Sequence, residues 1–251
     1  QVTNTGLNPI TELYYGGNGP SSEFSRFIFK PDLSRLAAFN TDGTIKDLTK
    51  VKHVLKLKNT GLFDLAMVKR KASSFDLILF DINQEWDEGA GYDYSANCAV
   101  GESDFKITPS NWVEARSNES WNGGPGVFTG TTTGITTQHF DAGNEDLEMD
   151  VTNLINNILS GATTNYGLGI AFDRFTEETP TTELQYVGFF TRHTDTLYEP
   201  YIETTYDNPI KDDRSNFYLD KTNKLYLYVN LGGEPTNLDS LPTVTIKNTS
   251  D

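Results

Sequence analysis

The chain has 251 residues, of which 36% are hydrophobic and 12% aromatic, so it has enough apolar material to build a core of its own. Its 35 acidic and 20 basic side chains give a formal net charge of −15 at pH 7. This acidity, without a basic face, argues against a nucleic-acid partner. No run of about 18 apolar residues predicts membrane insertion.

A single cysteine, Cys98, means that no intramolecular disulfide can form. The three histidines, His53, His139 and His193, stand apart in the sequence, and no nucleophile motif surrounds Cys98. We therefore interpret Cys98 as a small buried side chain. Because the chain begins with Gln1 and not with methionine, we expect either that an upstream segment was removed or that this is a piece of a longer polypeptide.

Short apolar-polar alternations separated by glycine-rich and proline-rich turns predict many β-strands. In the segment 53–58 the lysines fall on one face and the leucines on the other, as in a strand with one wet side. The spacing predicts an all-β, antiparallel, jelly-roll-like β-sandwich. The expected strands are 24–29, 51–58, 75–81, 111–115, 136–140, 167–172, 184–191, 198–205 and 225–230.

One segment, 150–161, breaks the strand pattern. Its apolar residues recur at helical spacing, with Asp150 as a candidate N-cap and Gly161 as a stop. We expect one short helix here, closing an end of the sandwich.

The polar, proline-containing stretch 207–214 predicts a boundary, with a β-sandwich domain over 1–209 and a small β-rich segment over 210–251. In the second part we expect strands at 217–220, 224–229 and 243–246. A dozen apolar or aromatic residues lie within about thirty positions, more than so short a unit can bury. We predict that Phe217, Tyr218, Tyr226 and Tyr228 form an interface with the sandwich, a neighbouring subunit or a further domain.

Six sequence pieces occur in an order that resembles the DNRLRE-type domain, a jelly-roll sandwich. The pieces are 25–33, 84–89, Asn111-Trp112 followed by Trp121, 150–152, 165–167 and 198–206. Where that family carries Ser-Arg-Glu before its last strand, this chain has Thr191-Arg192-His193, so only the arginine is kept. The family occurs in phage structural proteins, bacterial surface proteins and polysaccharide-degrading assemblies, so the resemblance implies one of these settings.

The densest group of carboxylates lies in the segment 81–93. Oxygen ligands on a loop suit Ca²⁺, and Asp87, Glu88 and Asp93 are the candidate ligands, although the spacing does not match a helix-loop-helix calcium loop. The alternative is structural: Trp86 packs in the core while Asp87 and Glu88 cap backbone amides. No other cofactor is implied.

The three tryptophans are candidates either for core positions or for stacking on a sugar ring. We assign Trp86 and Trp112 to the core. Trp121, beside Asn122-Gly123-Gly124, is the candidate for an exposed carbohydrate-binding ring, with a core position as its alternative.

No catalytic motif is present in the sequence, so we interpret the chain as a non-enzyme. The first hypothesis is a structural or interaction module of an extracellular particle, a bacteriophage virion component such as a fibre, collar, tail or decoration protein, in a homo- or hetero-oligomer. The alternative is a carbohydrate-binding module of a secreted or cell-surface protein. An enzyme such as a polysaccharide depolymerase would need an acidic cleft that the sequence does not indicate.

Overall fold

The computed structural model describes residues 6–16, 23–45, 47–61, 74–89, 110–124, 136–178, 185–206, 213, 217–232, 234–240 and 242–245. The chain divides into two compact units, Gln1–Asp207 and Asn208–Asp251. Each unit is described below by itself.

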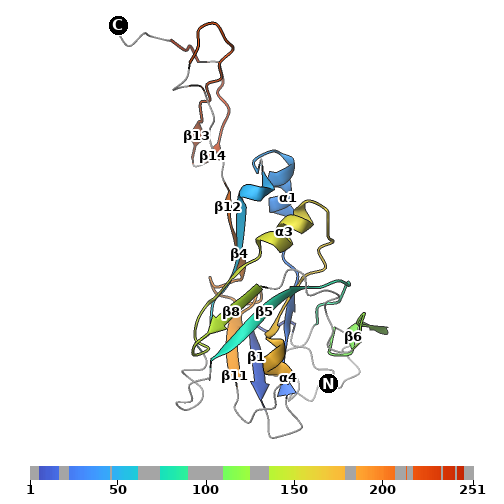
Figure 1. Cartoon of the computed structure of the whole chain (residues 1–251). Coiled ribbons are helices and arrows are strands. Elements are labelled where there is room, and N and C mark those ends of the chain that lie inside the picture. Colours follow the sequence, from blue (N-terminus) through green and yellow to red (C-terminus); the bar gives the residue numbers. More distant parts are fainter. Residues whose placement is uncertain are drawn as a thin grey trace. The chain divides into compact units, whose positions relative to one another are not determined.

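The first unit is an antiparallel β-sandwich, which confirms the predicted fold class; the jelly-roll order stays a prediction (Figure 1). One layer is a four-stranded sheet in which β10 pairs with both β3 and β5, and β5 pairs with β8. Its strands are β3 (Phe27–Phe29), β10 (Leu168–Phe172), β5 (Phe75–Asp81) and β8 (Thr136–Phe140).

The other layer consists of two three-stranded groups. The first group, in spatial order, is β11 (Gln185–Phe190), β1 (Ile10–Gly16) and β2 (Glu23–Phe24), and the second is β12 (Tyr201–Tyr206), β4 (Val51–Leu57) and β9 (Leu147–Asp150). Residues 58–60, which follow β4, join the groups, because Phe190 N donates to the Lys58 carbonyl at 3.0 Å and Thr60 N to that of Gly188 at 2.9 Å.

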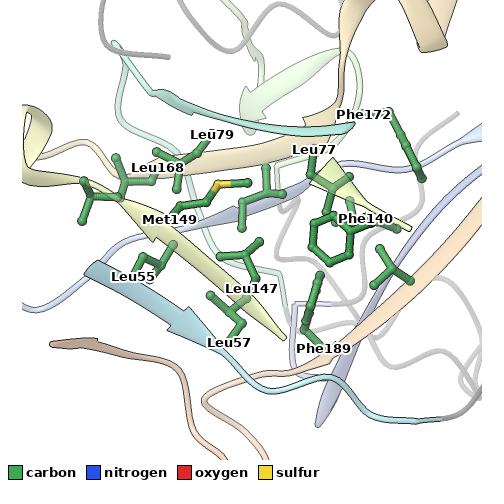
Figure 2. Close-up of a cluster of buried hydrophobic side chains, with 14 of the residues drawn as sticks. Leu55, Leu57, Leu77, Leu79, Phe140, Leu147, Met149, Leu168, Phe172 and Phe189 are labelled. Atoms are coloured by element: carbon green, nitrogen blue, oxygen red, sulfur yellow. The ribbon is translucent and has the colours of Figure 1, made fainter. Parts of the chain in front are cut away.

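The main core lies between these layers. Alternate residues of each strand point inward, so β5 contributes Leu77 and Leu79 while β4 contributes Leu55 and Leu57, all with at most 1% of their surface exposed. Figure 2 shows these side chains converging from facing strands, together with Phe140. Removal of this apolar surface from water is the main stabilising term of the first unit.

The helix predicted at 150–161 is confirmed as α3 (Thr152–Leu159). Val151 occupies the N-cap position, and the Asp150 carboxylate accepts from Thr152 N at 2.9 Å. Gly161 follows the helix with φ +77°, a conformation that glycine adopts without steric cost.

The expectation of a single helix was wrong. The first unit also contains α1 (Ser34–Thr41), a 3₁₀ turn at Leu48–Lys50 and α4 (Arg174–Glu178). Leu36 of α1 and Ile155 of α3 both pack on the main core, and the two helices contact each other (Figure 1).

A second, smaller core lies on the outer face of the β3-β10-β5-β8 sheet. Outward-pointing Ile28, Phe80 and Ala171 are covered by residues 110–124, which include the hairpin of β6 (Glu114–Arg116) and β7 (Glu119–Ser120). Phe80 packs over Gly169, where an added Cβ would lie 2.3 Å from the ring. This sheet is therefore buried on both faces.

The second unit differs from the sequence prediction. Its described strands are only β13 (Asn230–Leu231) and β14 (Glu234–Pro235), which pair antiparallel. Residues 217–220 form a turn instead of a strand, since the Asn223 side chain binds Tyr218 N at 3.0 Å and the Lys221 carbonyl at 2.8 Å. The described parts of 224–229 and 243–246 are not paired as strands either.

Candidate functional site

A cavity of about 230 Å³ opens where four segments of the first unit meet. Trp86 and Tyr166 supply aromatic surface, and charged side chains supply the remaining lining: Lys30, Glu85, Asp87 and Arg116. Arg116 is held in place by Glu85 (Nη2 to Oε2, 3.0 Å) and by Glu119 (Nε to Oε2, 3.1 Å).

The position of Trp86 in this cavity is fixed by the backbone beside it. Its indole Nε1 donates to the Tyr166 carbonyl at 2.7 Å. The next residue, Gly167, has φ +115°, and a Cβ there would lie 2.6 Å from the Phe29 carbonyl oxygen and 3.2 Å from Trp86 Nε1. Only glycine fits this position, so the ring orientation is built into the fold.

Two polar groups of the cavity remain available to a ligand. Within the described residues, neither the Lys30 ammonium nor the Tyr166 hydroxyl forms a hydrogen bond or ion pair. An aromatic surface with adjacent donors and acceptors is suited to a sugar ring. At this volume the cavity holds one ring and not a drug-sized ligand, for which pockets run from about 300 Å³ upward.

Of the predicted calcium ligands, the structure describes Asp87 and Glu88, so the three-residue site stays a prediction. Asp93 lies outside the described residues, and the Glu88 carboxylate is paired with Arg192 and lies 3.1 Å from His193 Nε2. Among the residues that the structure describes, no group of three or more His, Cys, Asp or Glu side chains could hold a metal ion. Trp86 packs on the second core, in line with the structural alternative, but Glu88 binds a guanidinium and not a backbone amide.

Of the two positions left open for Trp121, the structure shows the core position and not the exposed one. The residue is only 3% exposed, and its indole Nε1 donates to the Asn111 carbonyl at 2.7 Å. Buried Gln84 holds the same hairpin, accepting from Asn122 N at 2.8 Å and donating to the Ser120 carbonyl at 3.1 Å. Trp121 thus closes the second core and offers no ring face to a sugar, because the turn beside it folds back onto the sheet.

Trp112 and Trp86 are both half-buried against the second core. The Arg26 guanidinium lies over the Trp112 ring, 4.9 Å from its centroid, and also pairs with Glu177. The side chains of this ion pair are 19% and 10% exposed. The cluster ties the residue before β3 to α4 and to the hairpin segment, so we assign it to structure.

The three histidines lie in separate places. His53 is fully buried, with Nδ1 2.8 Å from the Thr204 hydroxyl, and burial lowers its pKa. Exposed His139 has a raised pKa because its Nδ1 lies 2.6 Å from the Asp76 carboxylate. Cys98 lies outside the described residues. Within the described residues, the three histidines do not come together in one site.

A second hollow of the first unit, of about 430 Å³, lies beside the start of α3. It is lined in part by Asp150 and Thr152. The Asp150 carboxylate caps the helix there, and the hydrogen bonds from Thr152 lower its pKa. The Thr136 hydroxyl donates to the Asp150 carbonyl at 2.8 Å. These groups serve the helix end, and we assign no ligand to the hollow.

The second unit carries a surface of exposed apolar side chains, which we call the C-terminal apolar surface. Of the predicted interface residues, Tyr218, Tyr226 and Tyr228 are exposed by 57%, 45% and 62%, while Phe217 is half-buried. The other members are Leu219, Leu225, Leu227, Leu231, Leu238 and Val244, with exposures from 43% to 88%. Clustered exposure of this kind marks contact surfaces in soluble proteins.

No protein-family model, curated protein or solved structure matches the chain. The resemblance to the DNRLRE-type domain therefore stays a hypothesis based on the sequence pieces alone. None of the helices in the described part of the chain has the length and apolar character needed to cross a membrane.

Proposed function

We propose that the chain is a non-catalytic structural module of an extracellular particle such as a bacteriophage virion, and that its second unit joins it to neighbouring subunits. The observation that carries the proposal is the C-terminal apolar surface: Leu219, Leu227 and Leu231 are 88%, 65% and 74% exposed. Burying a leucine side chain contributes about 1.5–3 kcal/mol. Covering several such residues with a partner would be strongly favourable.

The charge distribution supports the same assignment. Of the 35 acidic and 20 basic side chains, residues 208–251 hold six and five, which leaves 29 and 15 for residues 1–207. Copies of the strongly acidic first unit repel one another, whereas the second unit is nearly neutral and can approach another protein without that cost. A particle component would then make its contacts through the second unit.

Labelling and proteolysis of purified particles test this function. Immunogold electron microscopy with antibodies against the chain should mark particles from the source culture, and the region beyond residue 212 should resist protease in the particle more than in the free chain. Absence of label from every particle fraction would contradict the particle assignment. Equal resistance in both forms would contradict the role given to the second unit.

Carbohydrate binding is a second candidate function, favoured by the cavity beside Trp86 and Tyr166. Neutral and uronic-acid oligosaccharides are titrated against the chain and followed by the fluorescence of its tryptophans. We expect saturable quenching that Lys30→Ala weakens, while the control Lys52→Ala, on an exposed strand position, leaves it unchanged. No saturable change with either sugar class would remove this candidate.

A further inference from the structure

One wall of the cavity beside Trp86 carries Lys30 and Tyr166, and contacts within the fold tie these two residues together. The Asn165 side chain donates to the Pro31 carbonyl at 3.0 Å, so the residue before Tyr166 is bound to the residue after Lys30. The strands β3, which ends just before Lys30, and β10, which begins just after Tyr166, pair with each other. The sheet therefore sets the separation of these two side chains before any ligand binds.

A second wall carries Asp87 and Arg116, and it is also held by contacts within the fold. Asp87 N donates to the Ala115 carbonyl at 3.0 Å, and the Asp87 carbonyl accepts from Ser110 N at 3.0 Å. The Arg116 guanidinium is held by Glu85, with Nη2 3.0 Å from Oε2. Groups that are already ordered lose less conformational entropy when a ligand binds. The cavity is therefore preorganised on both walls.

Trp86 offers a ligand ring surface and no hydrogen bond. Its one polar atom, the indole nitrogen, already donates to the Tyr166 carbonyl at 2.7 Å. A pyranose ring has an apolar face of C–H groups that packs well on such a surface. Trp86 thus provides contact area, and the polar side chains of the cavity decide which ring is accepted.

The charges of the cavity lining balance. The lining contains two cations, Lys30 and Arg116, and two carboxylates, Glu85 and Asp87. The guanidinium charge is already balanced, because its carboxylate neighbours, Glu85 first and then Glu119 and Asp87, hold its pKa above the usual arginine value. A charged ring would lose its hydration here without a surplus of opposite charge to replace it. Such a lining favours an uncharged ligand.

The charge of the whole first unit adds to this selection. Residues 1–207 hold 29 acidic and 15 basic side chains, so a sugar with a carboxylate approaches against a repulsive field. The same field attracts a sugar with an ammonium group, but that group would have to enter a cavity that already holds Lys30 and Arg116. A neutral sugar meets neither obstacle.

We propose that this cavity binds a neutral pyranose ring, with its apolar face on Trp86 and its hydroxyl groups bonded to Lys30 and Asp87. The Lys30 ammonium only donates hydrogen bonds and the ionised Asp87 carboxylate only accepts them, whereas a hydroxyl group does both. A carboxylate on the ring would suit Lys30 alone, and an ammonium would suit Asp87 alone. The inference rests on the second candidate function, carbohydrate binding, and names the class of sugar and the residues that select it.

The test is calorimetric titration of the whole 251-residue chain with methyl glycosides that share a ring and differ in charge. The methyl glycosides of glucose, galactose and mannose are each compared with the corresponding uronic acid and amino sugar at neutral pH. We expect at least one neutral glycoside to bind about tenfold or more tightly than its two charged counterparts, a ratio that corresponds to one hydrogen bond to a charged group.

Two variants identify the cavity as the site. Lys30→Met removes the ammonium and keeps the length of the side chain, and Asp87→Ala removes the carboxylate. Each should weaken binding of the neutral glycoside about tenfold. The matched controls Lys52→Met and Asp195→Ala, at exposed positions of the first unit outside this cavity, should leave binding unchanged. These exposed side chains are changed in place of Trp86, which packs on the second core and supports the fold.

The outcomes separate this inference from the function on which it rests. A uronic acid or amino sugar that binds as tightly as the neutral glycoside overturns the neutral ring and leaves carbohydrate binding in place. Binding that neither Lys30→Met nor Asp87→Ala weakens overturns the site. Binding of longer oligosaccharides without binding of any methyl glycoside also overturns the inference alone. If no sugar of any class binds, both the inference and the carbohydrate candidate are contradicted, while the particle role of the second unit is not.

Discussion

The two units treat their large apolar side chains in opposite ways. In the first unit Leu77, Phe140 and Phe172 have no exposed surface, whereas in the second unit Leu219 and Leu227 are 88% and 65% exposed. Apolar burial is the main driving force of folding. The first unit buries these side chains against one another, so its stability comes from contacts within the unit. The described part of the second unit leaves many of its large apolar side chains in contact with water.

Polar groups follow the same contrast. In the first unit, buried Gln84 satisfies both ends of its amide within the hairpin. In the second unit, the Asn223 side chain stabilises its own turn by binding three backbone groups, the Tyr218 N–H and the carbonyls of Tyr218 and Lys221. Local hydrogen bonds give a turn its shape but bury little surface, so the second unit contributes little folding free energy by itself.

The largest expected effect comes from truncating a core side chain of the first unit. Phe140 lies on Phe75, with ring centroids 5.3 Å apart, and Phe140→Ala should lower the free energy of unfolding by about 3–5 kcal/mol. Leu227→Ala should change it by no more than about 0.5 kcal/mol. Urea unfolding followed by tryptophan fluorescence measures both. Similar losses in the two variants would show that the two units unfold together, which would contradict the difference in burial drawn between them.

The Arg26–Glu177 ion pair provides a smaller effect within the first unit. Arg26→Ala leaves a carboxylate that is only 10% exposed without its cation, and should cost about 3 kcal/mol, the lower end for a buried pair. The control Lys58→Ala breaks an exposed pair with Asp146 and should cost about 0.5 kcal/mol. Chemical denaturation distinguishes them. Equal losses of unfolding free energy in the two variants would mean that water reaches the Arg26–Glu177 pair as freely as the Lys58–Asp146 pair.

Gly169 tests how tightly the second core is packed. An alanine Cβ would lie 2.3 Å from the Phe80 ring, so Gly169→Ala must displace the ring and should cost about 1–3 kcal/mol. Adding Phe80→Leu should recover part of that loss by making room. Thermal melting of the single and double variants measures both steps, and additive losses would argue against this contact.

The smallest effect is the pH dependence due to His53. Burial lowers its pKa in the folded state, so the unfolded chain takes up the proton first, and stability should fall as the pH drops below about 6.5. In His53→Leu the melting temperature should change less between about pH 7.5 and pH 5 than it does in the unsubstituted chain. The control His139→Gln should act in the opposite sense, because the neighbouring Asp76 raises the pKa of His139. A steeper acid dependence in His53→Leu would contradict the assignment.

Local pattern was enough to predict several of the strands. The predicted bounds 75–81 and 136–140 coincide with β5 and β8, and α3 lies within its predicted segment. The pattern missed β1, whose partner β11 lies about 170 residues further along the chain. It also placed a strand at 224–229, which is not assigned as a strand within the described residues.

The candidate sites were harder to predict for a physical reason. The cavity lining comes from Lys30, the loop after β5, Arg116 and Tyr166, and sheet pairing alone brings these together. The spacing of residues along the sequence does not indicate that these four segments lie together. Trp121 was misplaced because a glycine-rich neighbourhood indicates a turn but not the direction in which the turn faces.

The exposed face of the β12-β4-β9 sheet has a consequence for crowded surroundings. Lys56, at its centre, lies 2.9 Å from Glu203 and 3.4 Å from Glu148, so one cation bridges three strands. A neighbour that docked there would have to strip water from all three charges, at several kcal/mol for each ion that becomes buried. This face of the sheet is therefore an unfavourable place for another protein to dock.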